Sequence, residues 1–433
     1  MTKILYIPTR YFPSISGAEF YIQSIAEILS KDYNYHIDIF TSNAIDFKAL
    51  RDPKGKTIQI NDKHYNYVNN LKIKRFPIDY SYILKEKLEI IKKIDDYKPL
   101  NISDECLIRF LKNGPFLIDL YKSFLDSPKD QYNLIHTTFF PYFNLILALM
   151  IGNLIKKPTI CTPFFHFSNP RYLDGPLKEL LKKFDLLIAC TNLEKKILIE
   201  KVLVPQKKIE VIPMGVDYNK FKYLQNNIYL DYSFKKKFFR DKEIKYKMVL
   251  FCGYKNYEKG AISILKAIPH IIRRYRRVYF VFIGPSTKAY NIELRKLLLD
   301  KNVRIINFTP DNLNGYFDKK KIVAFRDADL YLMPSRSDAY GIAFLEAWAS
   351  HKPVIGANIG ATPEVIRNNT DGLLVKFDNP KDIADKVVFL LKKPPIRKRF
   401  GIAGEEKIIK HNTWNIIANK TNMIYQELIK NHE

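Results

Sequence analysis

The chain has 433 residues, and its 71 Lys and Arg against 45 Asp and Glu give a formal charge of +26. Hydrophobic residues make up 47% of the chain, which excludes a disordered protein, and only 16 glycines exclude a glycine-rich fibrous one. At roughly 100–200 residues per domain, the length predicts two or three domains. The positive charge indicates either a polyanionic partner or lysine-rich faces in water.

The first half of the chain alternates short apolar runs with helical segments. Strands are expected at 4–7, 36–40, 134–136, 158–161 and 186–189, with a helix at 19–30. Buried strands that alternate with helices predict a parallel sheet covered on both faces. Ligands of such sheets bind at the carboxyl ends of the strands.

Two segments of this half need a separate interpretation. Residues 46–130 are less regular, with a lysine-rich amphipathic helix at 84–94 and a helical pair at 104–112 and 116–125. We interpret them as a structural insertion, and the alternative is a lid or an acceptor platform. The apolar run 143–155 is shorter than the roughly 20 residues of a membrane span, so it predicts a core helix.

A second series of strands is expected at 248–252, 279–284, 303–308, 330–333 and 353–356. The polar, lysine-rich segment 218–247 separates the two series. We therefore predict an N-terminal domain at 1–213, on which a closing helix at 412–433 packs back, and a C-terminal domain at 214–411. The predicted fold class is α/β, with two Rossmann-like, doubly wound parallel-sheet domains that face a central cleft.

The cysteines are Cys106, Cys161, Cys190 and Cys252, which lie far apart in apolar surroundings. They form no CxxC pair and no Cys/His cluster with zinc spacing, so we expect buried free thiols in a reducing compartment. The chain opens on a short apolar run that reads as a strand and not as a signal peptide. We therefore expect a cytoplasmic protein.

The segment 333–347 is the most informative one, because it follows a buried strand and runs into a helix. Gly341 lets a ligand approach the backbone, and a helix that begins at Ile342 points N–H groups at a phosphate there. Asp338 lies before the helix and Glu346 about one turn inside it. Both carboxylates can accept hydrogen bonds from sugar hydroxyls, although an acid before a helix also serves as a cap.

This segment resembles the signature of glycosyltransferase family 4, whose members have the GT-B fold. In that signature a carboxylate, seven residues and a Glu follow one another within a "PS..E.fG...lEA" pattern. Other segments resemble family motifs in the same order: 16–19 the "GGAE" loop, 208–217 the end of the first domain, 251–260 the "fvGr....KG" loop, 360–364 the "GG.pE" motif and 414–428 the closing helix.

The resemblance implies a role for each matching residue. Asp338 would contact the transferred sugar, and His166 would face the reacting centre, with a buried core histidine as the alternative for His166. Lys259 would neutralise the donor diphosphate, and Glu346 would accept hydrogen bonds from the ribose. The residues assigned to donor binding are Gly17, Lys255, Lys259, Tyr340, Gly341, Ile342 and Glu346.

Four positions depart from the family pattern. Ser16 replaces the first glycine of the loop, and Met214 replaces an Asn at the end of the first domain. Tyr254 stands where the family has a phosphate-binding Arg, so either its hydroxyl or the adjacent Lys255 would have to replace that contact. Asp338 replaces a Glu and is one methylene shorter.

Other motifs receive structural interpretations. Asp327 and Asp329 form a DxD pattern, but they precede a strand, so we assign them to capping and turn formation. Basic clusters at 273–277 and 319–321 read as surface helices without a nucleic-acid-binding module around them. We therefore expect no nucleic-acid partner. The alternatives that remain are a non-catalytic protein that binds nucleotide sugars and a basic RNA-binding protein.

The sequence thus predicts a retaining glycosyltransferase. Its partners would be a nucleotide-diphosphate sugar as donor and a saccharide or lipid-linked hydroxyl as acceptor. The resemblance implies that no metal and no other cofactor is needed. The lysines at 85–93, 178–183 and 235–247 fit contact with an anionic membrane surface, so the protein would be cytoplasmic and peripheral at the inner face of the membrane.

Overall fold

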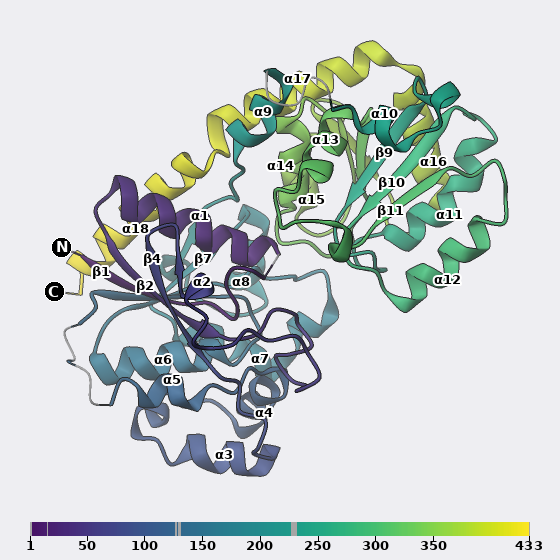
Figure 1. Cartoon of the computed structure of the whole chain (residues 1–433). Helices are drawn as coiled ribbons and strands as arrows, with labels where there is room; N and C mark the ends of the chain where they lie inside the picture. Colours follow the sequence, from purple (N-terminus) through teal and green to yellow (C-terminus); the bar gives the residue numbers. More distant parts are fainter. Residues whose placement is uncertain (1, 15, 126–127, 129–130, 227–231, 433) are drawn as a thin grey trace. The chain divides into compact units, whose positions relative to one another are not determined.

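The computed structural model describes residues 2–14, 16–125, 128, 131–226 and 232–432. They form two compact units: Met1–Pro213 with Trp414–Glu433, and Met214–Thr413 (Figure 1). Residues 126–127 and 129–130 of the segment read as an insertion, and 227–231 of the lysine-rich segment, lie outside the described residues. Each unit is an α/β domain built around one largely parallel sheet, as the sequence predicts.

The sheet of the first unit has the strand order β3-β4-β2-β1-β5-β6-β7-β8. Neighbouring strands pair in parallel, and β3 pairs antiparallel with β4 at the edge. The chain builds one side of the sheet up to β4 and then crosses to β5 on the other side of β1. The strands are β1 (Lys3–Ile7), β2 (His36–Ser42), β3 (Tyr67–Val68), β4 (Leu71–Phe76), β5 (Leu134–Thr138), β6 (Thr159–Thr162), β7 (Leu186–Ala189) and β8 (Ile209–Val211).

Strand β4 was not expected from the sequence, which treats 46–130 as less regular. Its residues alternate as a half-buried strand does, because Leu71 and Ile73 are buried while Lys72 and Lys74 are exposed. The strand pairs with β2 from Asp38 to Ser42. The interpretation of the whole segment as an insertion is therefore wrong, since this part of it belongs to the sheet.

Helices cover both faces of the first sheet. Almost every residue of α6 is buried, which confirms the predicted core helix at the apolar run. Helix α18 packs along α1, with the rings of Phe20 and Trp414 5.6 Å apart. The helices are α1 (Gly17–Asp32), α2 (Lys63–Asn66), α3 (Leu84–Lys92), α4 (Asp104–Asn113), α5 (Ile118–Lys122), α6 (Asn144–Ile155), α7 (Gly175–Lys178), α8 (Asn192–Glu200) and α18 (Trp414–Lys430).

The sheet of the second unit has the order β11-β10-β9-β12-β13-β14, with parallel pairing. This is the order of doubly wound nucleotide-binding domains, and it reverses between β9 and β12. Ligands of such sheets bind outside the carboxyl ends of the strands at that reversal. The strands are β9 (Lys247–Cys252), β10 (Val278–Ile283), β11 (Ile305–Phe308), β12 (Leu330–Met333), β13 (Val354–Ala357) and β14 (Gly372–Val375), the last of which was not expected.

The segment before β9 is fixed to the second unit by the acids of the DxD pattern. Asp327 accepts hydrogen bonds from the Phe234 backbone N–H at 2.6 Å and the Ser233 hydroxyl at 3.0 Å. The Asp329 carboxylate lies 2.9 Å from both the Lys235 and the Lys247 ammonium groups. Both acids therefore have structural partners, in agreement with their assignment to capping.

The helices of the second unit are α9 (Tyr218–Asn226), α10 (Phe234–Phe238), α11 (Ala261–Ile272), α12 (Lys288–Leu297), α13 (Lys319–Asp327), α14 (Ile342–Ala349), α15 (Thr362–Val365), α16 (Pro380–Lys392) and α17 (Pro394–His411). Within the described ranges, no helix of either unit combines the length and the apolar character that a membrane crossing requires. The four cysteines are free thiols; Cys106, Cys161 and Cys190 are buried as expected, whereas Cys252 is only partly buried.

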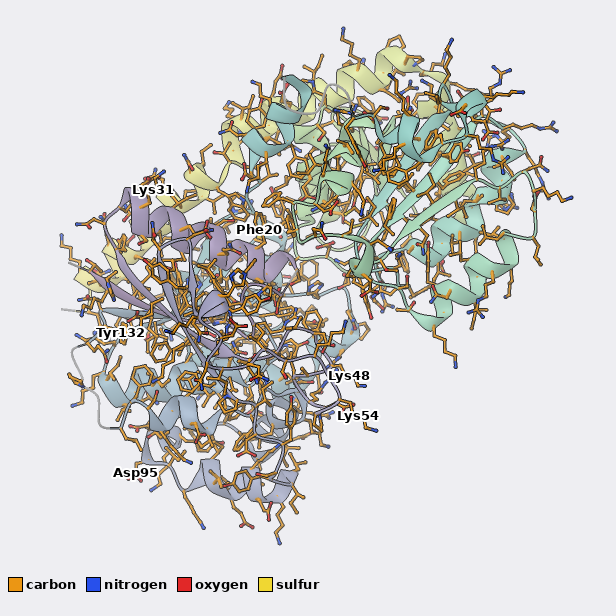
Figure 2. All side chains as sticks on the ribbon, in the orientation of Figure 1. Phe20, Lys31, Lys48, Lys54, Asp95 and Tyr132 are labelled. Carbon is orange, nitrogen blue, oxygen red and sulfur yellow. The ribbon has the colours of Figure 1, made fainter. Side chains whose placement is uncertain are left out.

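Many of the lysines extend into water. Lys31, Lys48 and Lys54 of the first unit are exposed (Figure 2). Exposed lysines of this kind supply positive charge without contributing to a site, so part of the net charge belongs to solvated faces.

Candidate active site

The residues of the strongest motif lie in two loops that leave neighbouring strands. Lys259 lies in the loop after β9, and Asp338 lies in the loop after β12. Strands β9 and β12 are adjacent in the sheet although two other strands separate them in the chain. Both loops are therefore at the reversal of strand order, where ligands of this architecture bind.

Lys259 and Asp338 form an ion pair. The Lys259 Nζ lies 2.6 Å from Asp338 Oδ2 and 3.5 Å from the Ser337 carbonyl oxygen. The Lys259 side chain is 23% exposed and that of Asp338 is 13% exposed, so both are partly shielded and still reach solvent. The residues assigned to the diphosphate and to the sugar thus neutralise each other in the chain without a donor.

Backbone and side-chain contacts hold the two loops together. The Arg336 guanidinium is bound to the Glu258 carboxylate, with Nε 2.9 Å from Oε2. The Arg336 backbone N–H and the Ser335 hydroxyl donate to the Glu258 carbonyl at 2.7 and 3.1 Å. Gly260 has φ +74°, and a Cβ there would lie 2.2 Å from the Pro334 oxygen, so only glycine allows this approach.

Helix α14 starts directly after this loop. Gly341, its N-cap, has φ +95°, and a Cβ there would lie 2.6 Å from the Phe344 ring. Ile342 is the first helical residue, so free N–H groups of the first turn are close to the glycine. The Tyr340 hydroxyl accepts a hydrogen bond from the Asn412 side-chain amide at 2.9 Å. Tyr340 is therefore fixed within its own unit.

Glu346 has a partner that sequence reasoning missed. Its Oε1 lies 2.7 Å from the Lys321 Nζ, and the two side chains are only 2% and 7% exposed. The Tyr316 hydroxyl also hydrogen-bonds to Glu346, and burial raises the pKa of Tyr316 well above its usual value. The interpretation of Lys321 as part of a surface cluster is wrong. A signal was present, because Lys321 is four residues before the buried Phe325 on one helix face.

Lys255 is buried, and its ammonium is used inside the second unit. It donates to Asn307 Oδ1 at 2.7 Å and to the Phe308 carbonyl at 2.8 Å, at the carboxyl end of β11. Burial lowers the pKa of Lys255 to about 8. In contrast, Tyr254 is 47% exposed. Of the two replacements considered for the missing Arg, the tyrosine hydroxyl is the group that solvent can reach.

The lowered pKa of Lys255 predicts that the stability of the folded chain depends on pH. Because its pKa is lower in the folded chain, the unfolded chain binds more protons above about pH 8, and folding becomes more favourable as the pH rises from there toward the ordinary lysine pKa. Lys255→Met is expected to reduce that rise, and Lys352, whose pKa burial also lowers to about 8, accounts for part of the rise that remains. Thermal unfolding midpoints of both proteins at pH 7.5 and 9.5 check this. A parallel change in the two proteins would contradict the assignment, and Lys266→Met, at an exposed site, is the matched control.

In the first unit, Gly17 opens helix α1 at the carboxyl end of β1. The Ser16 hydroxyl donates to the Glu19 carboxylate, which also forms a buried ion pair with Arg10 at 2.8 Å. Arg10 donates to the Ile45 carbonyl at 2.9 Å as well. This buried Arg10–Glu19 pair, which the sequence did not suggest, fixes the start of the helix. Gly17 itself is exposed at this edge of the sheet.

His166 follows β6 at the same edge of the first sheet. Buried Glu194 accepts hydrogen bonds from the backbone N–H groups of Phe165 at 2.9 Å and Cys190 at 2.7 Å, which fixes the chain just before the histidine. The His166 ring lies 5.2 Å from the Tyr172 ring and is partly exposed. The core-residue alternative therefore does not describe His166, and its role at the reacting centre stays a prediction.

His136, in the middle of β5, is a buried core histidine. Its Nδ1 lies 2.5 Å from the Tyr425 hydroxyl and its Nε2 lies 2.8 Å from the Thr162 hydroxyl. Burial lowers the pKa of His136 to about 3, so the ring is neutral near pH 7. The Tyr425 hydroxyl also lies 2.7 Å from that of Tyr6. This network joins α18 to the sheet and has no free group for chemistry.

The structure shows which of the lysines that we expected at a membrane surface have partners within the chain and which are exposed. Lys235 and Lys247 pair with Asp329, so their charge is balanced within the second unit. Lys85 and Lys93 on and after α3 remain exposed.

Among the residues that the structure describes, no three His, Cys, Asp or Glu side chains are grouped so that they could hold a metal ion.

Comparison with known proteins agrees with this geometry. Residues 233–407 match the model described as "Glycosyl transferases group 1", and residues 98–220 match "Glycosyltransferase Family 4". An uncharacterized glycosyltransferase of Methanocaldococcus jannaschii is 23% identical over 99% of both chains. The phosphatidyl-myo-inositol mannosyltransferase of Mycobacterium tuberculosis (strain ATCC 25618 / H37Rv) is 25% identical over 65% of this chain and 70% of its own. Anabaena HepE in complex with UDP-glucose superposes with a TM-score of 0.71, at 14% identity, over 99% of this chain and 100% of that one.

Proposed function

Because the chain is a glycosyltransferase of group 1 with the GT-B fold, we propose that it transfers a sugar from a nucleoside diphosphate sugar to an acceptor hydroxyl with retention of configuration. The single observation that carries the proposal is the Lys259–Asp338 pair of 2.6 Å, located where the strand order reverses and next to the first turn of α14. A cation and helix N–H groups suit a diphosphate, and a carboxylate suits sugar hydroxyls.

Donor binding exchanges the partners of this pair. The diphosphate attracts Lys259, and the Asp338 carboxylate becomes available to accept hydrogen bonds from the sugar. Negative charge grows on the diphosphate oxygen as its bond to the anomeric carbon breaks, and Lys259 with the α14 N–H groups stabilises that charge. The electron pair of the broken bond stays on the diphosphate.

The acceptor oxygen then bonds to the anomeric carbon on the face that the diphosphate leaves, which retains the configuration. The acceptor proton passes to the departing phosphate oxygen, so no covalent enzyme intermediate forms. His166 positions the sugar in this scheme. Its partial exposure and its place at the carboxyl edge of the first sheet support that role.

For the substrates, we propose a UDP-sugar or a related donor and a saccharide or lipid-linked acceptor. The solved HepE structure contains UDP-glucose, and the mycobacterial relative is named for phosphatidyl-myo-inositol. A further relative, from Corynebacterium jeikeium, is named for D-inositol 3-phosphate. These names support a phosphorylated polyol among the first acceptors to be tried. Exposed lysines near α3 support contact with anionic lipid.

The test is a turnover assay on the full chain. Nucleoside diphosphate release from a panel of nucleotide sugars is expected to rise when an acceptor is added, because transfer requires one. EDTA is expected to leave the rate unchanged, since Lys259 and helix N–H groups meet the diphosphate charge. Tight binding of a nucleoside diphosphate without turnover on any acceptor would contradict the proposal. A rate abolished by EDTA and restored by a divalent cation would contradict its metal-free part.

A further inference from the structure

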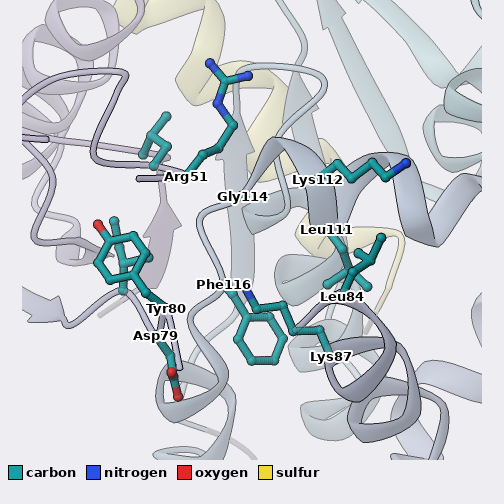
Figure 3. A pocket seen from close by; sticks show the side chains of 11 residues that line it. Arg51, Asp79, Tyr80, Leu84, Lys87, Leu111, Lys112, Gly114 and Phe116 are labelled. Atoms are coloured by element: carbon teal, nitrogen blue, oxygen red, sulfur yellow. The ribbon is translucent and has the colours of Figure 1, made fainter. Parts of the chain in front are cut away.

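A cavity in the first unit combines an apolar floor with a positively charged rim (Figure 3). Its volume is ≈ 180 Å³. Residues after β2, after β4, on α3 and at the end of α4 line it, which places it at the carboxyl edge of the first sheet. That edge also carries Gly17 and His166. The cavity residues belong to the segment that sequence reasoning took for an insertion.

The floor of the cavity is rigid. Leu50, Ile78, Leu111 and Phe116 are at most 7% exposed and belong to the core of the unit. Gly114 has φ +64°, and a Cβ there would lie 2.0 Å from the Leu50 carbonyl oxygen, so the two walls meet at a position that only glycine fits. The cavity is therefore built into the fold.

The rim carries three cations and one carboxylate. Arg51, Lys87 and Lys112 against Asp79 give a local charge of 3 − 1 = +2. Among the described residues, no hydrogen bond or ion pair engages the side-chain nitrogens of these three cations. Asp79 Oδ1 accepts hydrogen bonds from the Ser81 backbone N–H at 2.9 Å and the Ser81 hydroxyl at 2.5 Å, while its Oδ2 stays available to a ligand hydroxyl.

Lys87 is the cation that the cavity shields most. Its ammonium lies 5.2 Å from the centre of the Phe116 ring, and Figure 3 shows it beside that ring. Partial burial lowers the pKa of Lys87, and Asp79 opposes that effect. An ammonium that is partly withdrawn from water without an ion-pair partner gains free energy when an anion binds beside it.

We propose that this cavity binds the phosphate group of a polyol phosphate ester, and that this ester is the acceptor of the transferase. The local charge of +2 matches the charge of about −1.5 to −2 on a phosphate monoester near pH 7. The cavity is smaller than the roughly 300–1,000 Å³ of sites that enclose a drug-sized ligand, so it holds a headgroup and leaves the rest outside. The identity of the acceptor rests on the proposed function, whereas phosphate binding does not.

The binding test uses the full chain without nucleotide. In calorimetric titrations, sn-glycerol 3-phosphate and glucose 6-phosphate are expected to bind, and glycerol and glucose are not. Lys87→Met is expected to weaken binding about tenfold or more, since it removes a charge-assisted hydrogen bond. Lys31→Met removes the same charge from an exposed residue of the same unit that does not line the cavity, and is expected to change little. Lys259→Met separates this site from the donor site and is expected to keep phosphate binding.

A second experiment tests whether the phosphate ester is a lipid headgroup or a soluble molecule. Vesicles of phosphatidylcholine with phosphatidylglycerol, compared with pure phosphatidylcholine, test a lipid headgroup. Dependence of vesicle binding on Lys87 but not on Lys31 would assign the lipid source, and binding of the soluble esters alone would assign a soluble acceptor.

Equal affinity in Lys87→Met and in the unchanged chain would overturn the proposal, and so would the lack of binding to every phosphorylated probe. If phosphate binds here while no nucleotide sugar turns over, the proposed function fails and the site stands. If transfer occurs equally well to unphosphorylated acceptors, the site fails as an acceptor site and the transferase stands.

Discussion

Lys259→Ala is expected to lower kcat/KM for the nucleotide sugar by about 10²–10³-fold, the loss typical of one group that stabilises charge in the transition state. The reason is the position of its ammonium, 2.6 Å from Asp338 and beside the first turn of α14. Most of the loss is expected in kcat, because the charge on the departing diphosphate is greatest in the transition state. Steady-state kinetics with a saturating acceptor measure it.

Two further variants make this result specific. Lys266→Ala removes an exposed lysine from helix α11, just beyond the same loop, and is expected to keep the original rate. Lys259→Arg keeps the charge but changes its geometry, so its rate is expected to lie between the rates of Lys259→Ala and Lys266→Ala. Unchanged turnover in Lys259→Ala would show that this lysine pairs with Asp338 for structural reasons alone.

Glu346→Gln is expected to reduce both donor affinity and stability. Its carboxylate neutralises Lys321 at 2.7 Å, and both side chains are almost fully buried. Removing one partner of such a pair leaves an uncompensated buried charge, which costs about 3–5 kcal/mol. Urea unfolding of the variant measures the free energy of unfolding, and nucleoside diphosphate titration measures donor affinity.

The double variant Glu346→Leu/Lys321→Met separates the two effects. It replaces the ion pair by apolar side chains of similar volume, so stability is expected to return to near the original value. Donor affinity is expected to stay low, because we propose that the Glu346 carboxylate binds the ribose of the donor and the double variant lacks it. Recovery of both quantities would mean that Glu346 acts only through Lys321. Glu293→Gln is the control, since its pair with Lys296 is exposed and contributes little.

Much of the fold could be predicted from the sequence, because strands and helices each require a characteristic spacing of apolar residues along the chain. The strands at β1, β7 and β12 have the expected bounds within one residue, and α6 is the expected core helix. Strand β4 carried the period-two pattern of Leu71 and Ile73 as well, but the irregular segments around it hid the signal. The glycines of the loops after β9 and β12 were also recognisable as motif positions, and both Gly260 and Gly341 have a positive φ that favours glycine.

The partners of the charged side chains could not be derived in this way. A helical or strand period tells which face a residue lies on, but not which distant residue meets it there. Lys255 and Lys259 are four residues apart and carry the same side chain. One ammonium is enclosed at the end of β11, and the other is paired with Asp338 near solvent.

The sequence by itself determined the two parallel-sheet domains and the order of the motifs, because these depend on the spacing of residues along the chain. Only the tertiary structure decided which of the many lysines are available. The strand order brings the loops after β9 and β12 together, buries Lys321 against Glu346, and places the Lys87 ammonium beside the Phe116 ring in the apolar cavity. Side chains distant in the chain acquire partners only when the topology places their strands and helices side by side.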